Sequence, residues 1–316
     1  MGIHIMGTGH YLPKKVVTNE DFEKIMDTSD EWIVKRTGIK RRHYVEGGMW
    51  NKDMCIAAAN IAMEEAGITK EDLGGIVVAS VTNEMGVPSV ASQIQRELDL
   101  GGGICFDVNS ACTGFMFALK AVEGLLKPGG KPFLVCGSET LSRFMNAEDR
   151  GSSILFGDGA GAVIVEHGDH SKYFEVNSRP DFEHTIEING MNTKVDGEYV
   201  PSYVSLKGRE VYVFATREAE SIIKEALAET GKTPEDIDWF LMHQSNIRIT
   251  KTIASRLGLS MDKFYSNIDD TSNTSAASIP IALDQMNKKG MLKKGDVMVI
   301  AGFGGGLSSG CMIYEW

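Results

Sequence analysis

Short apolar runs alternate with longer amphipathic segments along most of the chain. The runs at residues 76–78, 133–136, 162–165 and 297–300 have the composition of buried β-strands. Between them, apolar side chains recur three and four positions apart, as on the buried face of a helix. This alternation predicts an α/β fold in which helices cover the sheets.

The pattern repeats within the chain. Residues 110–115 resemble residues 274–279, an offset of 274 − 110 = 164, and each segment precedes an amphipathic helix pattern. Duplicated units of this kind bury their faces against each other. We therefore predict two similar halves, residues 1–165 and 166–316, although residues 167–205 have no clear counterpart in the first half.

Different side chains occupy equivalent positions of the two halves. Ala276 is the counterpart of Cys112, and Ala79 is the counterpart of His243. If the two helix starts meet about a pseudo-two-fold axis, Cys112 lies close to Asn273, and His243 reaches both from the end of its strand. We therefore predict one site built from both halves.

Cys112 is the candidate nucleophile. Small residues flank it at the predicted start of a helix, where backbone N–H groups and the helix dipole stabilise a thiolate and so lower the pKa of the thiol. A thiolate can attack a thioester and hold the acyl group covalently. The local sequence is also compatible with a buried, unreactive cysteine.

His243 and Asn273 are the candidate partners of that nucleophile. His243 follows an apolar run and can donate a hydrogen bond or move a proton, or it is a hydrogen-bonded structural histidine. The amide of Asn273 can help to hold an oxyanion, or it caps a helix. The glycines at residues 302–306 offer backbone N–H groups for an oxyanion hole, or only a tight turn.

Charge and composition exclude several classes of protein. There are 32 Lys and Arg against 43 Asp and Glu, and the formal net charge of −11 argues against broad nucleic-acid binding. Five cysteines without paired spacing, and a start without a basic and apolar leader, predict reduced thiols in the cytoplasm. No apolar stretch reaches the roughly 18 residues of a membrane span, so we expect no membrane association.

Two motifs fail to support a bound cofactor. Gly7 and Gly9 begin like a dinucleotide-binding loop, but Leu12 occupies the third glycine position. His167 and His170 lie close together in a polar segment without cysteine partners. We therefore expect neither a nicotinamide cofactor nor a metal ion.

Motifs from one end of the chain to the other resemble the β-ketoacyl-[acyl carrier protein] synthase III family of condensing enzymes. They include Ser-Ala-Cys-Thr-Gly-Phe at 110–115, Phe-Gly-Asp-Gly-Ala-Gly at 156–161, His-Gln-Ser-Asn at 243–246, Asn-Thr-Ser-Ala-Ala at 273–277 and Phe-Gly-Gly-Gly at 303–306. The resemblance implies a thiolase-like five-layer αβαβα fold of two duplicated halves, assembled as a homodimer.

The same resemblance implies the reaction. Cys112 takes a short-chain acyl group from acyl-CoA, and malonyl-[acyl carrier protein] then binds. His243 and Asn273 stabilise the enolate formed when the malonyl group loses CO₂, and the carbanion attacks the acyl-Cys112 thioester. Backbone N–H groups of Cys112 and Gly305 hold the tetrahedral oxyanion. Acyl-CoA and the acyl carrier protein are substrates, and no cofactor is implied.

The resemblance also assigns a path for CoA. Trp32 and Arg150 match an adenine clamp, a planar stack suited to a nucleotide base. The alternatives without a ligand are a tryptophan of the core and surface salt bridges. The positions that match the pantetheine and phosphate path are Thr28, Arg36, Gly208 and Asn246.

A small basic face is predicted beside this path. Arg248, Lys251 and Arg256 recur along a helix pattern after the histidine motif. On an acidic protein, such a face suits an acidic carrier protein. A solvated helix face without a partner is the alternative.

Several positions depart from the family pattern. Val87 and Phe303 match the acyl pocket, but Val87 stands where an aromatic residue is frequent, which predicts a larger pocket and primers longer or more branched than acetyl. Ser272 stands where glycine is common, which predicts altered backbone strain. Residues 172–204 also depart, and the resemblance gives no substrate detail there.

Three other functions remain open at this point. A condensing enzyme or acyltransferase of specialised metabolism keeps the triad and changes the acceptor. A thiolase needs a second reactive cysteine near residues 302–306, which contain none. A non-catalytic acyl-binding protein does not need Cys112, His243 and Asn273 together.

Overall fold

Two five-stranded sheets form the frame of the molecule in the computed structural model, which describes residues 2–190 and 193–316. The first sheet has the spatial order β1 (Gly2–Tyr11), β7 (Asp158–Gly168), β6 (Phe133–Thr140), β4 (Gly75–Ala79) and β5 (Ile104–Val108). The second has the order β14 (Phe264–Tyr265), β13 (Trp239–Met242), β15 (Val297–Gly304), β16 (Ser308–Glu315) and β8 (Ser171–Ser178).

The second sheet repeats the first, strand for strand. From β5 onward the pairs β5–β4 and β4–β6 are parallel, and β6–β7 and β7–β1 are antiparallel. From β14 onward the same succession of parallel and antiparallel pairs recurs and ends at β8. The helices α5 (Gly114–Leu125) and α10 (Ser278–Lys288) begin 278 − 114 = 164 residues apart. The duplication predicted at this offset is therefore present in the fold.

The predicted boundary between the halves needs a correction. Residues 165 and 166 both lie within β7, because β1 stays paired with β7 from Gly168 back to Ala160. The chain turns only between Gly168 and Ser171, where β8 begins. Since β8 is the counterpart of β1, part of the segment that had no clear match at residues 167–205 belongs to the repeat.

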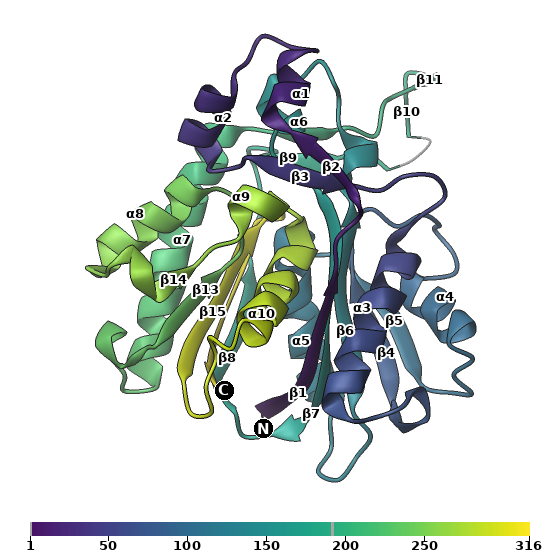
Figure 1. Ribbon diagram of the computed structural model, residues 1–316, viewed down its shortest axis with the longest axis vertical. Coiled ribbons are helices and arrows are strands. Elements are labelled where there is room, and N and C mark those ends of the chain that lie inside the picture. Colours follow the sequence, from purple (N-terminus) through teal and green to yellow (C-terminus); the bar gives the residue numbers. More distant parts are fainter. Residues whose placement is uncertain (1, 191–192) are drawn as a thin grey trace.

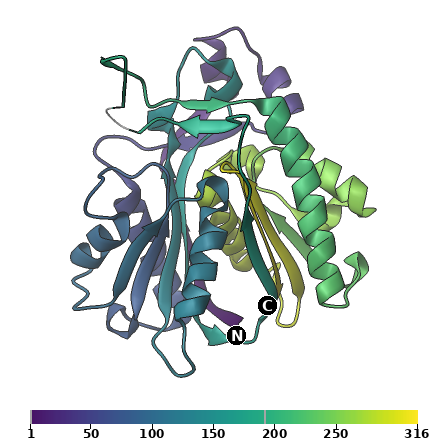
Figure 2. The ribbon, with the colours of Figure 1, turned by 180° about the vertical axis from the view of Figure 1, so that it is seen from behind.

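Helices fill the space between the sheets and cover both outer faces (Figure 1). The inner pair, α5 and α10, packs with both sheets in one apolar cluster that includes Val135, Leu119, Ile279 and Ile300. The first sheet is covered outside by α3 (Asn51–Ala66) and α4 (Val90–Glu97). The second is covered by α7 (Gly208–Glu229), the long green helix of Figure 2, and by α8 (Ile247–Leu257).

These five layers confirm the predicted αβαβα arrangement. They also explain why the strands consist of continuous apolar runs rather than alternating ones. Every residue of β4 is buried, because helices pack on both faces of its sheet. Among the helices of the described part of the chain, none is long and apolar enough to cross a membrane.

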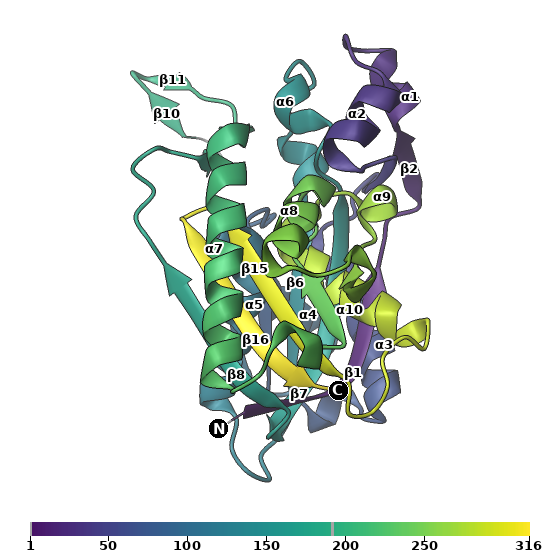
Figure 3. The same ribbon diagram turned by 90° about the vertical axis from the view of Figure 1, so that its left-hand side faces the viewer.

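The remaining elements gather at the end of the molecule opposite the two termini (Figures 1 and 3). They are α1 (Asn19–Glu23), α2 (Asp30–Thr37), α6 (Arg150–Ser153), α9 (Ile268–Thr271), β2 (Lys15–Thr18), β3 (Arg41–Tyr44), β9 (Ile186–Ile188), β10 (Lys194–Val195), β11 (Glu198–Tyr199) and β12 (Val204–Leu206). Two hairpin-like pairs, β9–β12 and β10–β11, come from the segment that departs from the family pattern.

Candidate active site

Cys112 lies in a short 3₁₀ turn, Ala111–Thr113, directly before α5. The end of β15 presses against this turn. A Cβ atom at Gly304 would lie 3.0 Å from the Cys112 backbone nitrogen, so a larger residue would push the cysteine turn away by a few tenths of an ångström. The glycine-rich segment therefore brings the two halves together at the cysteine.

His243 follows the last residue of β13 and is buried. Its Nδ1 atom lies 2.6 Å from the Ser278 Oγ atom at the start of α10. Its Nε2 atom has no hydrogen-bond partner among the described residues. Burial lowers the pKa of His243 to about 3, so the imidazole is neutral at physiological pH.

Asn273 lies two residues before the second 3₁₀ turn, Ser275–Ala277, which is the counterpart of the turn at Cys112. Its Oδ1 atom accepts a hydrogen bond of 2.8 Å from the backbone N–H of Ser275. The side-chain oxygen thus caps the turn, and the N–H₂ group remains the donor available to a ligand. The capping and functional interpretations use different atoms of one side chain and are compatible.

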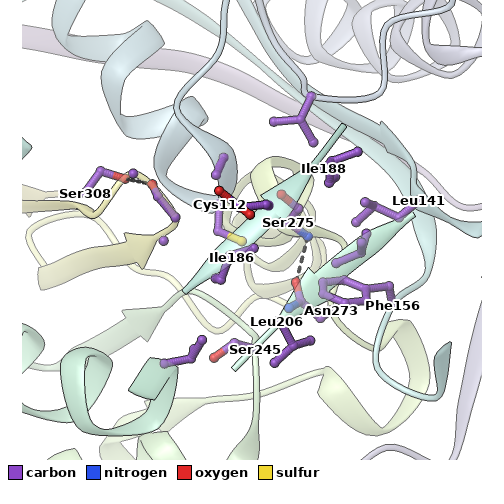
Figure 4. A pocket seen from close by; sticks show the side chains of 18 of the residues that line it. Cys112, Leu141, Phe156, Ile186, Ile188, Leu206, Ser245, Asn273, Ser275 and Ser308 are labelled. Atoms are coloured by element: carbon purple, nitrogen blue, oxygen red, sulfur yellow. Dashed lines mark hydrogen bonds between the residues drawn. The ribbon is translucent and has the colours of Figure 1, made fainter. Parts of the chain in front are cut away.

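Cys112, His243 and Asn273 line one cavity of about 1040 Å³. Figure 4 shows Cys112 and Asn273 on either side of Ser275, with apolar side chains around them. The labelled apolar residues that line the cavity are Leu141, Phe156, Ile186, Ile188 and Leu206. We call this space the Cys112 cavity.

The structure contradicts the predicted pKa of the nucleophile. Burial raises the pKa of Cys112 to about 11 instead of lowering it. Removal of water disfavours the thiolate. This effect on the pKa is larger than the stabilisation of the thiolate expected at the start of a helix. The thiol form is therefore the resting form in the ligand-free cavity, and the reaction needs a group that accepts its proton.

Three polar residues beside the triad were missed at the sequence level. Ser278 lies within hydrogen-bond distance of His243, Ser275 lines the Cys112 cavity, and Glu139 is a fully buried carboxylate on β6. Ser275 and Ser278 follow Asn273 closely in the sequence, but the segment was interpreted through the asparagine alone. Glu139 follows an apolar run in the sequence, like any polar residue at the end of a strand, and carries no distinguishing signal.

The predicted CoA residues fall into two groups. Arg36, Gly208 and Asn246 line the Cys112 cavity, whereas Thr28, Trp32 and Arg150 lie outside its lining. Two arginines nevertheless lie over the Trp32 ring. The guanidinium carbon of Arg150 is 4.7 Å from the ring centroid, and that of Arg36 is 5.4 Å from it. Arg36 thus connects the cavity to the predicted clamp, and the clamp residues contact each other.

In the single chain, Val87 lies outside the lining of the Cys112 cavity. Its side chain is 84% exposed, and the cavity reaches Met85 and Gly86 but not Val87. The chain turns outward here before Ser89 caps α4. Within one chain, Val87 therefore cannot enlarge the pocket, while Phe303 does line it.

The structure provides a physical setting for the Ser272 departure. Ser272 has a φ of 57°, in the region that favours glycine. Its Oγ atom lies beside Gly157. A Cβ atom added to Gly157 would lie only 2.4 Å from this oxygen. Serine at this position therefore carries backbone strain that glycine would not.

All three residues of the predicted basic face, Arg248, Lys251 and Arg256, are exposed, but their contacts differ. Arg248 and Lys251 are exposed, and Arg248 lines the cavity. Arg256 instead donates a hydrogen bond of 2.9 Å to the Thr216 carbonyl and pairs with Glu220, so it ties α8 to α7. A further arginine, Arg209, lines the cavity and was not predicted.

Part of the segment at residues 172–204 forms a wall of the cavity. Ile186 and Ile188 from β9 and Val204 from β12 line it. Leu206, two residues beyond the segment, continues this wall, and Figure 4 shows it near Ile186. The segment that gave no substrate detail in the sequence therefore supplies much of the apolar lining.

This combination of a duplicated five-layer fold and a cavity with cysteine, histidine and asparagine defines a thiolase-fold condensing enzyme. A family model described as 3-oxoacyl-[acyl-carrier-protein (ACP)] synthase III matches residues 106–181, and the C-terminal model of that family matches residues 227–316. The β-ketoacyl-[acyl-carrier-protein] synthase III of Clostridium acetobutylicum is 44% identical over 99% of this chain and 98% of its own. This chain belongs to the β-ketoacyl-[acyl-carrier-protein] synthase III family.

Solved structures agree with this assignment. The crystal structure of 3-oxoacyl-[acyl-carrier-protein] synthase III from Aquifex aeolicus matches with a TM-score of 0.93 at 38% identity, and 100% of both chains is covered. The priming β-ketosynthase of the R1128 polyketide pathway also gives a TM-score of 0.93, at 30% identity over 99% of this chain and 96% of its own. The fold is therefore shared by a 3-oxoacyl-[acyl-carrier-protein] synthase III and by a ketosynthase that primes a polyketide pathway.

Proposed function

We propose that this protein condenses a short-chain acyl-CoA with malonyl-[acyl carrier protein] through an acyl-Cys112 intermediate. The products are β-ketoacyl-[acyl carrier protein], CO₂ and CoA, so the reaction begins type II fatty-acid synthesis. The observation that carries this proposal is the meeting of Cys112, His243 and Asn273 in one cavity.

The first half-reaction transfers the acyl group. The Cys112 sulfur attacks the thioester carbonyl of acyl-CoA, and CoA leaves. The backbone N–H groups of Cys112 and Gly305 stabilise the tetrahedral oxyanion, a role supported by the close approach of the glycine-rich segment to the cysteine.

The second half-reaction forms the carbon–carbon bond. Decarboxylation of the malonyl group creates an enolate, whose oxygen accepts hydrogen bonds from His243 Nε2 and the Asn273 N–H₂ group. A neutral His243 suits this role, because its Nε2–H group donates a hydrogen bond when Nδ1 accepts one from Ser278. The carbanion then attacks the acyl-Cys112 thioester and regenerates the cysteine.

The approach to the cavity suits both substrates. Arg36, Arg209 and Arg248 line the cavity and provide positive charge for the phosphates of CoA and for an acidic carrier protein. Thr28, Trp32 and Arg150 lie further out, toward the adenine. We propose no resident cofactor, because the substrates supply both reacting groups.

The proposed setting is a homodimer in the cytoplasm. Ile104 of β5 and the loop residues Met85 and Val87 are exposed in the single chain. The strand β5 forms one edge of the first sheet. An apolar edge of this kind is suited to cover by a second copy.

A mass measurement tests the proposal. Purified protein is incubated with a panel of acyl-CoAs from acetyl to branched and longer chains, and its intact mass is recorded. We expect one added acyl group, lost in Cys112→Ala, and release of β-ketoacyl product when malonyl-[acyl carrier protein] follows. An adduct that persists in Cys112→Ala contradicts the assigned nucleophile.

The similarity to a priming β-ketosynthase favours one second candidate, a condensing enzyme of specialised metabolism. The acyl-enzyme would then form as above but discharge to a different acceptor. An acyl-Cys112 adduct that is stable to malonyl-[acyl carrier protein] of fatty-acid synthesis supports this candidate over the first.

A further inference from the structure

Side-chain hydroxyls join the glycine-rich turn after β15 to the turn that carries Cys112. Ser308 begins β16, opposite Gly304 of β15, and its Oγ atom donates a hydrogen bond of 2.8 Å to the Gly305 carbonyl. Thr113, directly after Cys112, places its Oγ1 atom 2.7 Å from the same Ser308 Oγ atom. We call the contacts from Thr113 through Ser308 to Gly305 the hydroxyl bridge.

The protons of the hydroxyl bridge have a defined direction. Each hydroxyl has one proton, and a carbonyl oxygen only accepts hydrogen bonds. Because the Ser308 proton goes to the Gly305 carbonyl, the proton between the two hydroxyls comes from Thr113. Thr113 shares this proton with the Ser110 carbonyl, which is also 2.7 Å from its Oγ1 atom. The hydroxyl bridge therefore runs without a break from the nucleophile turn to Gly305.

Burial strengthens the hydroxyl bridge. Thr113 is fully buried and Ser308 is 3% exposed, so little water competes for their hydroxyls, and a hydroxyl left without its partner here is costly. Ser308 also lines the Cys112 cavity. Figure 4 shows Ser308 and Asn273 on opposite sides of Cys112. The hydroxyl bridge therefore acts on the side of the nucleophile away from the asparagine.

The second copy of the turn has no hydroxyl at the equivalent position. The counterpart of Thr113 is Ala277, the last residue of the turn before α10. That turn nevertheless has the same 3₁₀ conformation and leads into its helix as the first turn leads into α5. The repeated fold therefore forms without this hydroxyl, which is present only in the copy that carries the nucleophile.

We propose that Thr113 and Ser308 are positioning residues that fix the distance between the two oxyanion donors. The donors are the backbone N–H groups of Cys112 and Gly305, so this inference rests on the proposed function. Thr113 follows Cys112 directly, and the Ser308 hydroxyl holds the carbonyl of Gly305 itself. Each end of the hydroxyl bridge is therefore within one residue of a donor.

The glycine-rich turn needs a restraint of this kind. Gly305 and Gly306 have no side chains to limit rotation of the backbone, yet an oxyanion hole is effective only when its donors already point at the developing charge. A Cβ atom would fit at Gly305, 3.4 Å from the Ile186 Cβ atom and 3.5 Å from the Ala111 Cβ atom. Packing therefore leaves space beside this glycine, and the hydroxyl bridge supplies the restraint.

Two reactions of Cys112 separate this positioning role from a general structural one. Attack on a thioester creates an oxyanion, whereas alkylation by iodoacetamide displaces iodide from a saturated carbon and creates none. In Ser308→Ala and in Thr113→Ala we expect acylation by the preferred acyl-CoA to slow by about ten-fold or more, while alkylation keeps its native rate. Intact mass measures acylation, and the mass of the peptide that contains Cys112 measures alkylation.

Conservative and combined variants test the hydroxyls themselves. Thr113→Ser keeps the hydroxyl and should acylate at close to the native rate. The double variant Thr113→Ala/Ser308→Ala should be no slower than Ser308→Ala, because both substitutions interrupt one bridge. Three results overturn the proposal: equal slowing of acylation and alkylation, native acylation in Ser308→Ala, or a Thr113→Ser protein as slow as Thr113→Ala.

Ser309→Ala is the matched control. Its hydroxyl is also buried, one residue further along β16, but it donates to Glu218 of α7 at 2.9 Å, so both reactions should keep their rates. If the native protein takes no acyl group from any acyl-CoA, the proposed function alone is refuted, and backbone hydrogen exchange at residues 304–307 decides the bridge. Faster exchange in Ser308→Ala then supports the bridge, and unchanged exchange overturns it.

Discussion

At the scale of single residues, burial decides the chemistry of the site. The same loss of water raises the pKa values of Cys112 and Glu139 and lowers that of His243. Near neutral pH, Cys112 is therefore a thiol, His243 is a neutral imidazole, and Glu139 is present in both its protonated and its ionised form. Hydroxyl groups accompany two of them, because Ser278 lies 2.6 Å from His243 Nδ1 and Thr82 donates a hydrogen bond to Glu139.

Ser278→Ala tests the hydroxyl that holds His243. Without the contact at Nδ1, the imidazole loses its fixed orientation and tautomer. We expect condensation with malonyl-[acyl carrier protein] to slow by roughly ten-fold or more, while acyl transfer from acyl-CoA to Cys112 keeps its rate. Stopped-flow acylation and steady-state condensation measure the two steps separately.

The control for this prediction is Ser309→Ala, which removes a buried hydroxyl bonded to Glu218 away from the triad. It should preserve both rates. Equal slowing of the two half-reactions in Ser278→Ala contradicts a role confined to His243.

At the scale of elements, two turns and two strand ends join the halves. The 3₁₀ turns before α5 and α10 have a residue with positive φ at equivalent positions, Ala111 at 45° and Ser275 at 48°. Strand β15 presses on the first turn at Gly304, and β6 presses on the second at Gly137. The active site is thus built where the two copies of one motif meet.

Gly137→Ala tests this junction. Its Cβ atom would lie 2.3 Å from the Ala276 carbonyl oxygen, and backbone on both sides must shift. We expect a loss of about 1–3 kcal/mol in the free energy of unfolding and slower acylation of Cys112. Urea denaturation and intact-mass kinetics provide the two measurements.

Gly124→Ala is the matched substitution. Gly124 is in α5 with open space around its Cα atom, so alanine should stabilise the helix by up to about 1 kcal/mol. A Gly137→Ala protein as stable as Gly124→Ala contradicts the close approach of the halves.

At the scale of the whole molecule, the protein is acidic, whereas three arginines line its active-site cavity. The chain carries a formal net charge of −11, yet Arg36, Arg209 and Arg248 line the Cys112 cavity. Such a local field guides an acidic partner to the entrance and weakens with salt.

Arg248→Ala and Arg256→Ala test this division of roles along α8. We expect Arg248→Ala to raise the KM for malonyl-[acyl carrier protein] several-fold at low salt, because one charge at the entrance is lost, with little change in kcat. Arg256→Ala should leave KM unchanged and lower the melting temperature slightly, because it removes the contacts to Thr216 and Glu220. Equal effects of the two variants on KM contradict this division of roles.

Much of the fold could be predicted from the sequence, because its causes are local or periodic. The apolar runs became strands since both faces of each sheet are covered, and the repeat at 164 residues became two matching sheets. The motifs around Cys112, His243 and Asn273 identified side chains that meet in one cavity. Their identity and order are properties of the chain alone.

The tertiary structure decided whatever depends on distant segments. The outward position of Val87, the contacts of Arg256 and the length of β7 follow from packing against other elements. The sign of the Cys112 pKa shift and the partners of Glu139 depend on which groups exclude water and donate hydrogen bonds there. Solvation and hydrogen bonding are set by neighbours in space, and a linear sequence does not specify these until it folds.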